Sequence, residues 1–253
     1  MCNKSVTKFT NMFMRVLKIA AFSVMILLFA IVFYAFQASR VNPYPDEKFE
    51  GPVPAYTEVA LPFSHKYGDR FLPVMASAII DIDADGIPEL FLGGGEDQSD
   101  ALFRFENGNF RDISGDFGLA MKPDATYGAQ VVDVDGDGRT DLVVARDSGT
   151  YFYLNRGKKF EQHKFDSFVS ARERVMSFGL TDLNRDGKVD LFAAVYLARA
   201  EMKGQTIFNE EGYGGTSRLL LNTGDLRFQD ITAASGLLKT HNTFSGIFVD
   251  VDG

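Results

Sequence analysis

Cysteine is almost absent from this chain, since Cys2 is the only one, and tryptophan is absent altogether. A single cysteine excludes a disulfide within the chain and every Cys-x-x-Cys zinc or redox motif. The three histidines, His65, His163 and His241, are far apart and match no metal-binding spacing such as His-Glu-x-x-His. No serine lies in the Gly-x-Ser-x-Gly context of a nucleophile elbow. The sequence therefore predicts no catalytic residues.

Acidic residues are missing from the first 45 positions, which carry five basic residues, and all 34 acidic residues of the chain follow. The whole chain has 26 Lys and Arg and a formal net charge of −8. Sequence-independent binding to nucleic acid needs an excess of Lys and Arg against the phosphates. Nucleic acid is therefore excluded as a partner, and cations are favoured.

Charge is also absent between Lys18 and Arg40. A helix of that length spans roughly 31 Å, about the hydrocarbon thickness of a bilayer. We therefore expect residues 19–39 to cross a membrane. Because basic residues precede this segment, the positive-inside rule predicts that residues 1–18 are a cytoplasmic tail and that the rest is periplasmic or extracellular.

The exit from this segment distinguishes a retained signal-anchor from a cleaved signal peptide. A cleavage site needs small residues at −3 and −1, and Phe36 or Gln37 occupies the −3 position. The retained anchor is favoured, and the cleaved signal peptide is the alternative. Residues 40–55 contain four prolines and are typical of a stiff linker to a domain at 56–253.

An Asp-rich segment recurs along the rest of the chain. It begins at Asp81, Asp133, Asp182 and Asp250, with spacings of 52, 49 and 68 residues. The long third spacing comes from an insertion at about 198–216. A second element, in which Asn and Gly precede a Phe, follows each complete copy at 107–110, 155–160 and 222–228.

Each copy is typical of four short strands. One apolar run enters the Asp-rich segment, another leaves it, and the Asn-containing element joins two more strands as a hairpin. Four strands in about 50 residues indicate a propeller blade, and a helical solenoid is excluded because no copy has sustained helical periodicity. We predict an all-β chain of β-propeller blades after one transmembrane helix. Three blades are complete, and 246–249 is the first strand of a fourth.

The Asp-rich segments have the pattern of a calcium loop, with carboxylates or Asn at positions 1, 3 and 5, Gly at position 6 and an acid at position 9. Alternating side chains turn toward one centre, the Gly permits a sharp turn, and position 7 offers its backbone carbonyl. About one Ca²⁺ is expected per complete loop. The predicted ligands are Asp81, Asp83, Asp85, Ile87 and Glu89; Asp133, Asp135, Asp137, Arg139 and Asp141; Asp182, Asn184, Asp186, Lys188 and Asp190; and Asp250 with Asp252.

The loops also resemble two other kinds of acidic segment. An EF-hand is excluded because position 12 is Leu92, Val144 or Ala193 instead of a bidentate Glu. Acidic β-turns without a metal remain the alternative, since Asp and Gly are common turn residues.

These loops, followed by Leu-Phe or Leu-Val, resemble the FG-GAP/VCBS repeat family, whose members resemble integrin-alpha β-propellers. The Asn-x-Gly element is similar to the subgroup with ASPIC/UnbV and cartilage-acidic-protein-like chains. The resemblance covers about 56–253 and implies a seven-bladed propeller with calcium on its blade loops, usually outside the cytoplasm. Since only three loops are complete, we expect the chain to be a C-terminally truncated fragment.

The sequence thus favours a membrane-anchored, extracytoplasmic, calcium-binding propeller that acts as a scaffold or interaction module for a protein or carbohydrate ligand. The insertion at 198–216 is a candidate contact surface. The alternative is an extracytoplasmic, hydrolase-like enzyme whose catalytic part lies beyond Gly253. An adhesion receptor is a third possibility, although no Arg-Gly-Asp motif is present.

Overall fold

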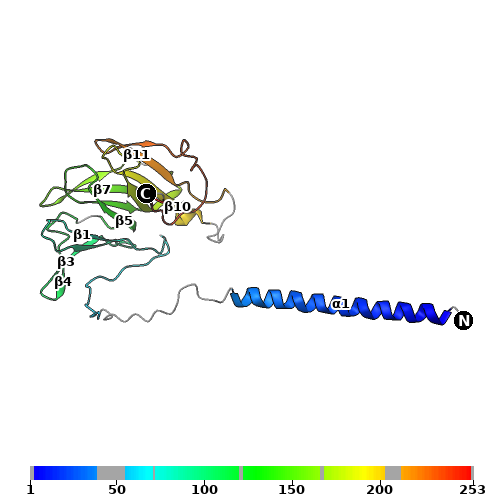
Figure 1. Ribbon diagram of the computed structural model, residues 1–253. Helices are drawn as coiled ribbons and strands as arrows, with labels where there is room; N and C mark the ends of the chain where they lie inside the picture. Colours follow the sequence, from blue (N-terminus) through cyan, green and yellow to red (C-terminus); the bar gives the residue numbers. More distant parts are fainter. Residues whose placement is uncertain are drawn as a thin grey trace. The chain divides into compact units, whose positions relative to one another are not determined.

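The computed structural model describes residues 3–38, 55–70, 72–119, 122–165, 168–202 and 212–251. The chain divides into two units, Met1–Thr57 and Glu58–Gly253. The first unit contains the helix, and the second contains the strands (Figure 1). Of the predicted linker, all but Ala55 lies outside the described residues.

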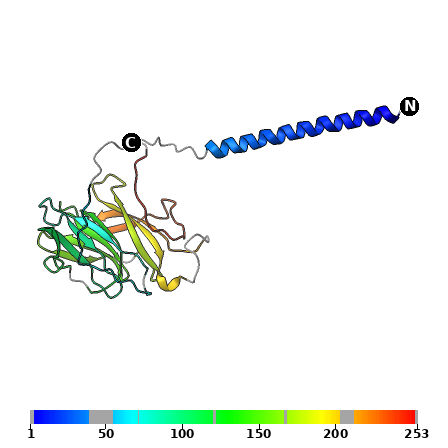
Figure 2. The same cartoon turned by 90° about the horizontal axis from the view of Figure 1, so that it is seen from below.

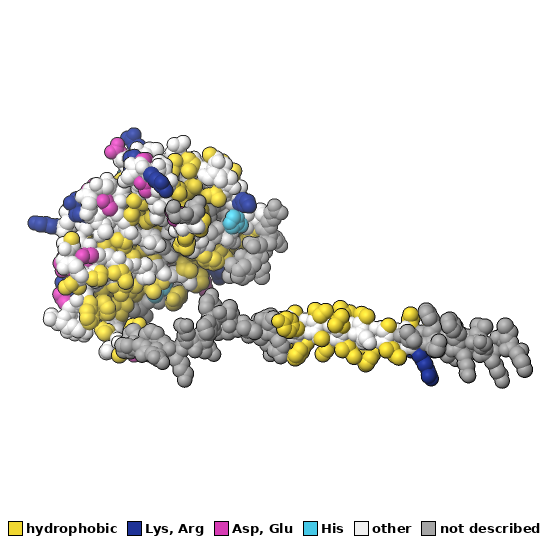
Figure 3. All heavy atoms as spheres, in the orientation of Figure 1, with side chains coloured by type: hydrophobic (Ala, Val, Ile, Leu, Met, Phe, Trp, Pro, Cys, Tyr) yellow, Lys and Arg dark blue, Asp and Glu magenta, His cyan; other side chains and the backbone are white. Residues whose placement is uncertain are grey.

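Helix α1 (Asn3–Ala38) is a single helix of 36 residues. It begins ahead of the predicted span because the basic segment before that span has no Pro or Gly to interrupt it. Its window Leu17–Phe36 is apolar and has no buried residue, and Figure 3 shows the apolar side chains along it. This window is long and apolar enough to cross a membrane, a property that signal sequences share.

Three four-stranded antiparallel sheets make up the second unit, and each contains its strands in chain order. Blade 1 consists of β1 (Ser77–Ile80), β2 (Glu89–Leu92), β3 (Ala101–Glu106) and β4 (Asn109–Asp112). Blade 2 consists of β5 (Thr126–Val132), β6 (Asp141–Arg146), β7 (Gly149–Asn155) and β8 (Phe160–Lys164). Blade 3 consists of β9 (Glu173–Thr181), β10 (Asp190–Leu197), β11 (Arg218–Gly224) and β12 (Arg227–Asp230). The prediction of three complete propeller blades is confirmed.

Strand β6 shows how the blades form their core. Its alternating residues point to opposite faces of the sheet, as in any strand. Leu142 and Val144 pack into a cluster shared with blade 1, whereas Val143 and Ala145 pack into a cluster shared with blade 3. All four are 0% exposed. Blade 2 is therefore buried on both faces, and the hydrophobic core lies in the seams between blades, whose sheets Figure 2 shows side by side.

The segment after blade 3 corrects one prediction. The phenyl ring of Phe248 lies 6.4 Å from that of Phe192, and the ring of Phe244 lies 4.7 Å from that of Tyr196, so this segment follows the far face of blade 3. However, 246–249 is not a strand. A strand needs a neighbour to pair with, and no described segment lies beside this one to complete a ladder.

The insertion at 198–216 is described in part. It begins with the short 3-10 helix η1 (Arg199–Glu201), and 203–211 lies outside the described residues. At its end, Thr216 forms an isolated β-bridge with Thr240. Its predicted role as a contact surface stays a prediction.

Candidate metal centre

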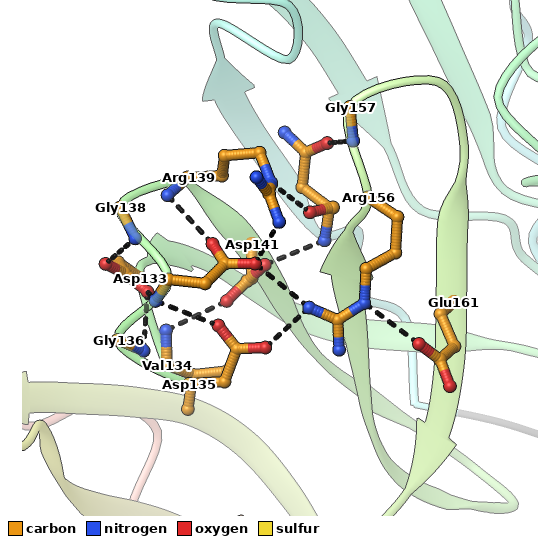
Figure 4. A network of polar contacts seen from close by, with 12 residues as sticks. Asp133, Val134, Asp135, Gly136, Gly138, Arg139, Asp141, Arg156, Gly157 and Glu161 are labelled. Carbon is orange, nitrogen blue, oxygen red and sulfur yellow. Dashed lines mark hydrogen bonds and ion pairs between the residues drawn. The ribbon is translucent and has the colours of Figure 1, made fainter.

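The three complete Asp-rich loops each join the first and second strands of a blade, so they have equivalent places in the three blades. Loop 1 is 81–89, loop 2 is 133–141 and loop 3 is 182–190. In each loop the carboxylate at position 1 accepts hydrogen bonds from the backbone N–H groups of positions 5 and 6. In loop 2, Asp133 accepts from the N–H of Asp137 at 3.1 Å. It also accepts from the N–H of Gly138 at 2.8 Å, as Figure 4 shows. The three loops therefore share one pattern of backbone hydrogen bonds.

Each loop turns through two residues with positive φ. The predicted Gly at position 6 has φ of 83° or 84° in every loop. Position 4 also has positive φ, at 56° for Ala84, 76° for Gly136 and 59° for Arg185. Residues other than Gly seldom adopt this conformation. Sequence reasoning missed position 4, for which Gly136 is the only glycine signal.

Three carboxylates converge in each of the first two loops. The groups consist of positions 1, 3 and 9, with candidate ligand atoms within 4.8 Å of one another. They are Asp81, Asp83 and Glu89 in loop 1, and Asp133, Asp135 and Asp141 in loop 2. Like charges this close repel one another, and an all-oxygen donor set fits a hard cation such as Ca²⁺. These acidic clusters can hold a metal ion.

The predicted ligands at positions 5 and 7 are not part of these groups. One oxygen of Asp137 accepts from the backbone N–H of Arg139 at 3.0 Å, and the other pairs with Arg156 at 3.0 Å. In loop 1, Asp85 accepts from the N–H of Ile87 at 2.7 Å. Coordination by positions 5 and 7 stays a prediction.

The acid at position 9 has a second role that the sequence pattern does not reveal. Glu89, Asp141 and Asp190 are each 0% exposed. Each accepts a hydrogen bond from the N–H of position 2 in its own loop, at 3.1, 2.9 and 2.8 Å respectively. In loops 2 and 3 the other oxygen accepts from the backbone N–H of Asn155 or Asn222, both at 2.8 Å. Position 9 therefore attaches the loop to the sheet.

The electrostatics of loop 2 reflect this burial. Desolvation raises the pKa of Asp141 to about 6, and hydrogen bonds from the N–H groups of Asn155 and Val134 oppose that rise. The charges of Asp135 and Asp137 raise the pKa further. The ionised carboxylate of Asp141 is thus held at an electrostatic cost, which a bound cation would offset.

Arginine side chains lie against both clusters. Arg104 of β3 pairs with Asp83 at 2.7 Å and with Glu89 at 2.6 Å. Arg156, directly after β7, pairs with Asp135 at 2.7 Å, as Figure 4 shows. Each position-3 carboxylate therefore contacts an arginine as well as lying in its cluster.

Loop 3 and the start of a fourth loop differ from this pattern. Loop 3 has Asn184 at position 3, and its Lys188 pairs with Asp186 at 2.9 Å. Loop 3 thus has one carboxylate fewer at the three converging positions. Asp250 is described and exposed, whereas Asp252 lies outside the described residues. Metal binding by these two loops stays a prediction.

The structure also separates asparagines that the sequence pattern groups together. Asn155 in β7 lies opposite Phe160 in β8, and Asn222 in β11 lies opposite Phe228 in β12. In β3 the residue in that register is Phe105. Asn107 instead lies in the turn between β3 and β4, with φ of 52°. The predicted hairpin is therefore present at all three elements, although Asn107 does not share the register of the other two asparagines.

The loops and blades match a known family. The sequence profile of the FG-GAP-like repeat matches the chain twice, over residues 81–144 and 133–193. Each match begins with one Asp-rich loop and ends in the strand after the next loop. Residues 81–193 contain FG-GAP-like repeats. The predicted repeat family is thereby confirmed, while the subgroup with ASPIC/UnbV chains and the count of seven blades stay predictions.

Among solved structures, the chain is similar to an Agrocybe aegerita lectin described as specifically recognising non-reducing terminal N-acetylglucosamine. The two are 18% identical, with a TM-score of 0.37, over 65% of this chain and 41% of the lectin chain. The chain thus spans less than half the length of that lectin chain. No curated protein matches this chain.

Proposed function

We propose that the FG-GAP-like repeats form part of a calcium-binding β-propeller that is anchored to a membrane by α1 and acts as a scaffold or interaction module. The observation that carries the proposal is the same three-carboxylate cluster at equivalent places in two consecutive blades. The repeat family supports the interaction role. Binding is favoured over catalysis because the sequence has no nucleophile or catalytic-metal motif.

Calcium bound to these loops would supply positive charge to an acidic site of which only the position-9 carboxylate is buried. Asp81, Asp83 and Glu89 would hold it in loop 1, and Asp133, Asp135 and Asp141 in loop 2. The position-1 carboxylates already order the turn through backbone N–H groups, so the loop is folded around its donor oxygens. The cation would stabilise the folded blade because it binds the assembled oxygens and not the unfolded chain.

A ligand has space beside the second cluster. A cavity of about 310 Å³ lies between blades 2 and 3 on the loop side. Asp135 and Arg156 line it from blade 2, and Lys188 and Asp225 line it from blade 3. Charges of both signs favour a polar ligand, and we propose a protein or a carbohydrate as that partner.

We propose further that α1 is retained, with the N-terminus in the cytoplasm and the repeats periplasmic or extracellular. Reporter fusions after residue 18 and after residue 60 should then lie on opposite sides of the membrane. A mature N-terminus near residues 38–40, found by mass spectrometry, would contradict retention and favour a cleaved signal peptide.

Calorimetry of the full chain in detergent micelles tests the cation site. Calcium chloride should bind with a Kd on the order of 10⁻⁴–10⁻³ M, the range of extracellular modules, and more tightly than magnesium chloride. Asp135→Asn should weaken calcium binding at one site, because it takes one charge from the loop 2 cluster. Asp112→Asn, outside the loops, is the matched control and should bind like wild type. No uptake at millimolar calcium would support acidic turns without a metal.

A further inference from the structure

Asn155 connects loop 2 of its own blade with loop 1 of the preceding blade. Its backbone N–H donates to Asp141 at 2.8 Å. Its side-chain Nδ2 donates across the seam to the backbone carbonyl of Ile82, at position 2 of loop 1, at 2.7 Å. Its Oδ1 accepts from the N–H of Gly157 at 2.8 Å, which sets the orientation of the amide. One residue that is 1% exposed therefore contacts two loops in two blades.

Asn222 repeats these connections at the second seam. Its backbone N–H donates to Asp190 at 2.8 Å, and its Oδ1 accepts from the N–H of Gly224 at 2.9 Å. Its Nδ2 lies 3.5 Å from the carbonyl of Val134, at position 2 of loop 2, and 3.2 Å from that of Val189. The contact across the second seam is thus longer than that across the first.

The residues at position 2 join these contacts into a series. The N–H of Val134 donates to Asp141 at 2.9 Å, while its carbonyl lies beside Asn222. In loop 3 the N–H of Leu183 donates to Asp190 at 2.8 Å. Hydrogen bonds therefore run from loop 1 through loop 2 to loop 3, through peptide groups and buried carboxylates, with the same atoms in the same order at both seams.

Blade 1 provides an internal contrast. Phe105 occupies the register of Asn155 there and is 42% exposed. The second oxygen of Glu89 pairs with Arg104 instead of a backbone N–H at that register. The asparagine occurs in blades 2 and 3, each of which contacts a preceding blade. In blade 1 it is replaced by Phe105, and the described part of the chain contains no blade before blade 1. This distribution favours a role between blades over a role within the hairpin.

We propose that Asn155 and Asn222 are positioning residues that couple each Asp-rich loop to the loop of the preceding blade. Acceptors in two loops hold the donors of one buried residue, since the backbone N–H of Asn155 donates to Asp141 and its Nδ2 donates to Ile82. Loosening either loop leaves one of these donors unpaired, which a buried site tolerates poorly. Ordering of one loop thereby orders its neighbour. The coupling of loop order is independent of any cation, and its extension to cation affinity rests on the proposed function.

Thr140 makes a second contact across the first seam. Its Oγ1 donates to the carbonyl of Asp81, at position 1 of loop 1, at 3.2 Å. The same position in loop 3 is Val189, which has no hydroxyl. A test at the first seam must therefore remove both Thr140 and Asn155, whereas a test at the second seam needs only Asn222.

Hydrogen exchange of the full chain in detergent micelles, read by mass spectrometry, tests the coupling. Asp133→Ala loosens loop 2, and the measured quantity is amide exchange in loop 1. In the otherwise wild-type chain this substitution should speed loop 1 exchange by about fivefold or more, a typical size for coupling between sites. In the Thr140→Val/Asn155→Ala background it should leave loop 1 unchanged. Asn107→Ala, in an exposed turn, is the matched control and should preserve the response.

An equal response of loop 1 in both backgrounds, or none in the wild-type background, would overturn the coupling. If the double variant does not fold, Asp182→Ala is read at loop 2 with and without Asn222→Ala, and the same criteria apply. Each arm is run in EGTA and in millimolar calcium. Coupling in EGTA, together with exchange rates that calcium changes in no loop, supports the asparagine contacts and contradicts the cation function. A calcium effect on exchange without any effect of the asparagines supports the cation function and overturns the coupling.

Discussion

Blades 1 and 3 end in turns with the same local hydrogen bonds. In blade 1 the backbone N–H of Ser114 donates to Asp112 at 2.9 Å. In blade 3 the N–H of Thr232 donates to Asp230 at 2.8 Å. Each turn then closes on a Gly-Leu pair whose leucine N–H donates to the carbonyl five residues earlier. Similar sequences therefore fold into the same turn at two places in the chain.

The two turns differ in what covers them. Leu119 in blade 1 is 0% exposed, whereas Leu237 in blade 3 is 45% exposed. Beside Leu119, the carbonyl of Phe117 accepts from the N–H of Phe160 in blade 2 at 2.9 Å. The described residues place no strand in that position over Leu237. The local sequence determines the turn, and a neighbouring blade determines whether its leucine is buried.

The largest expected effect comes from the strand with neighbours on both sides. Leu142→Ala in β6 removes a side chain that is 0% exposed from the seam between blades 1 and 2. Its loss leaves a cavity and should lower the free energy of unfolding by about 2–5 kcal/mol. Urea denaturation followed by circular dichroism measures this change. A loss below about 1 kcal/mol would contradict burial of β6 on both faces.

The two seams should differ next. Asn155→Ala leaves the carbonyl of Ile82 without its donor and should cost about 1–3 kcal/mol of unfolding free energy. Asn222→Ala should cost less, because its contact with the carbonyl of Val134 is longer, 3.5 Å against 2.7 Å. The same denaturation measurement compares the two variants. A larger loss of unfolding free energy for Asn222→Ala than for Asn155→Ala would show that the length of the contact across the seam does not determine the loss.

Calcium should separate loop 2 from loop 3. A cation at ten times its Kd stabilises the folded state by about 1.4 kcal/mol per site. Asp135→Asn should reduce the rise in Tm between EGTA and calcium, because loop 2 loses a converging carboxylate. Asn184→Asp should increase that rise, because loop 3 gains the carboxylate that loops 1 and 2 already have. Asp112→Asn, outside the loops, makes the same change in net charge as Asp135→Asn. An equal reduction in that variant would indicate an effect of net charge instead of coordination.

The smallest expected effect lies in the exposed turn. Leu237→Ser should change the free energy of unfolding by no more than about 0.5 kcal/mol, since the side chain is 45% exposed. Leu119→Ser, in the buried turn, should cost several times more in the same assay. Matching losses in the two variants would mean that Leu237 is covered in solution, and the comparison between the turns would fail.

Much of the fold follows from local sequence. The strands and loops of the three blades were predictable because period-two burial and the Gly at position 6 are short-range features. The strand predicted at 246–249 was not found, because pairing depends on a neighbour that local sequence does not reveal. The hairpins at 107–110, 155–160 and 222–228 were predictable, but the different position of Asn107 within its hairpin was not, since register depends on the opposite strand.

The sequence by itself determined the repeats, the apolar helix and the residue types of the Asp-rich loops, since each depends on spacing within one stretch of chain. Only the tertiary structure decided which carboxylates converge, which acids are buried, and that Asn155 reaches the loop of the preceding blade. Those properties depend on residues as far apart as Ile82 and Asn155. Packing of one blade on the next brings such residues together, and burial in the seam makes each unpaired polar group costly.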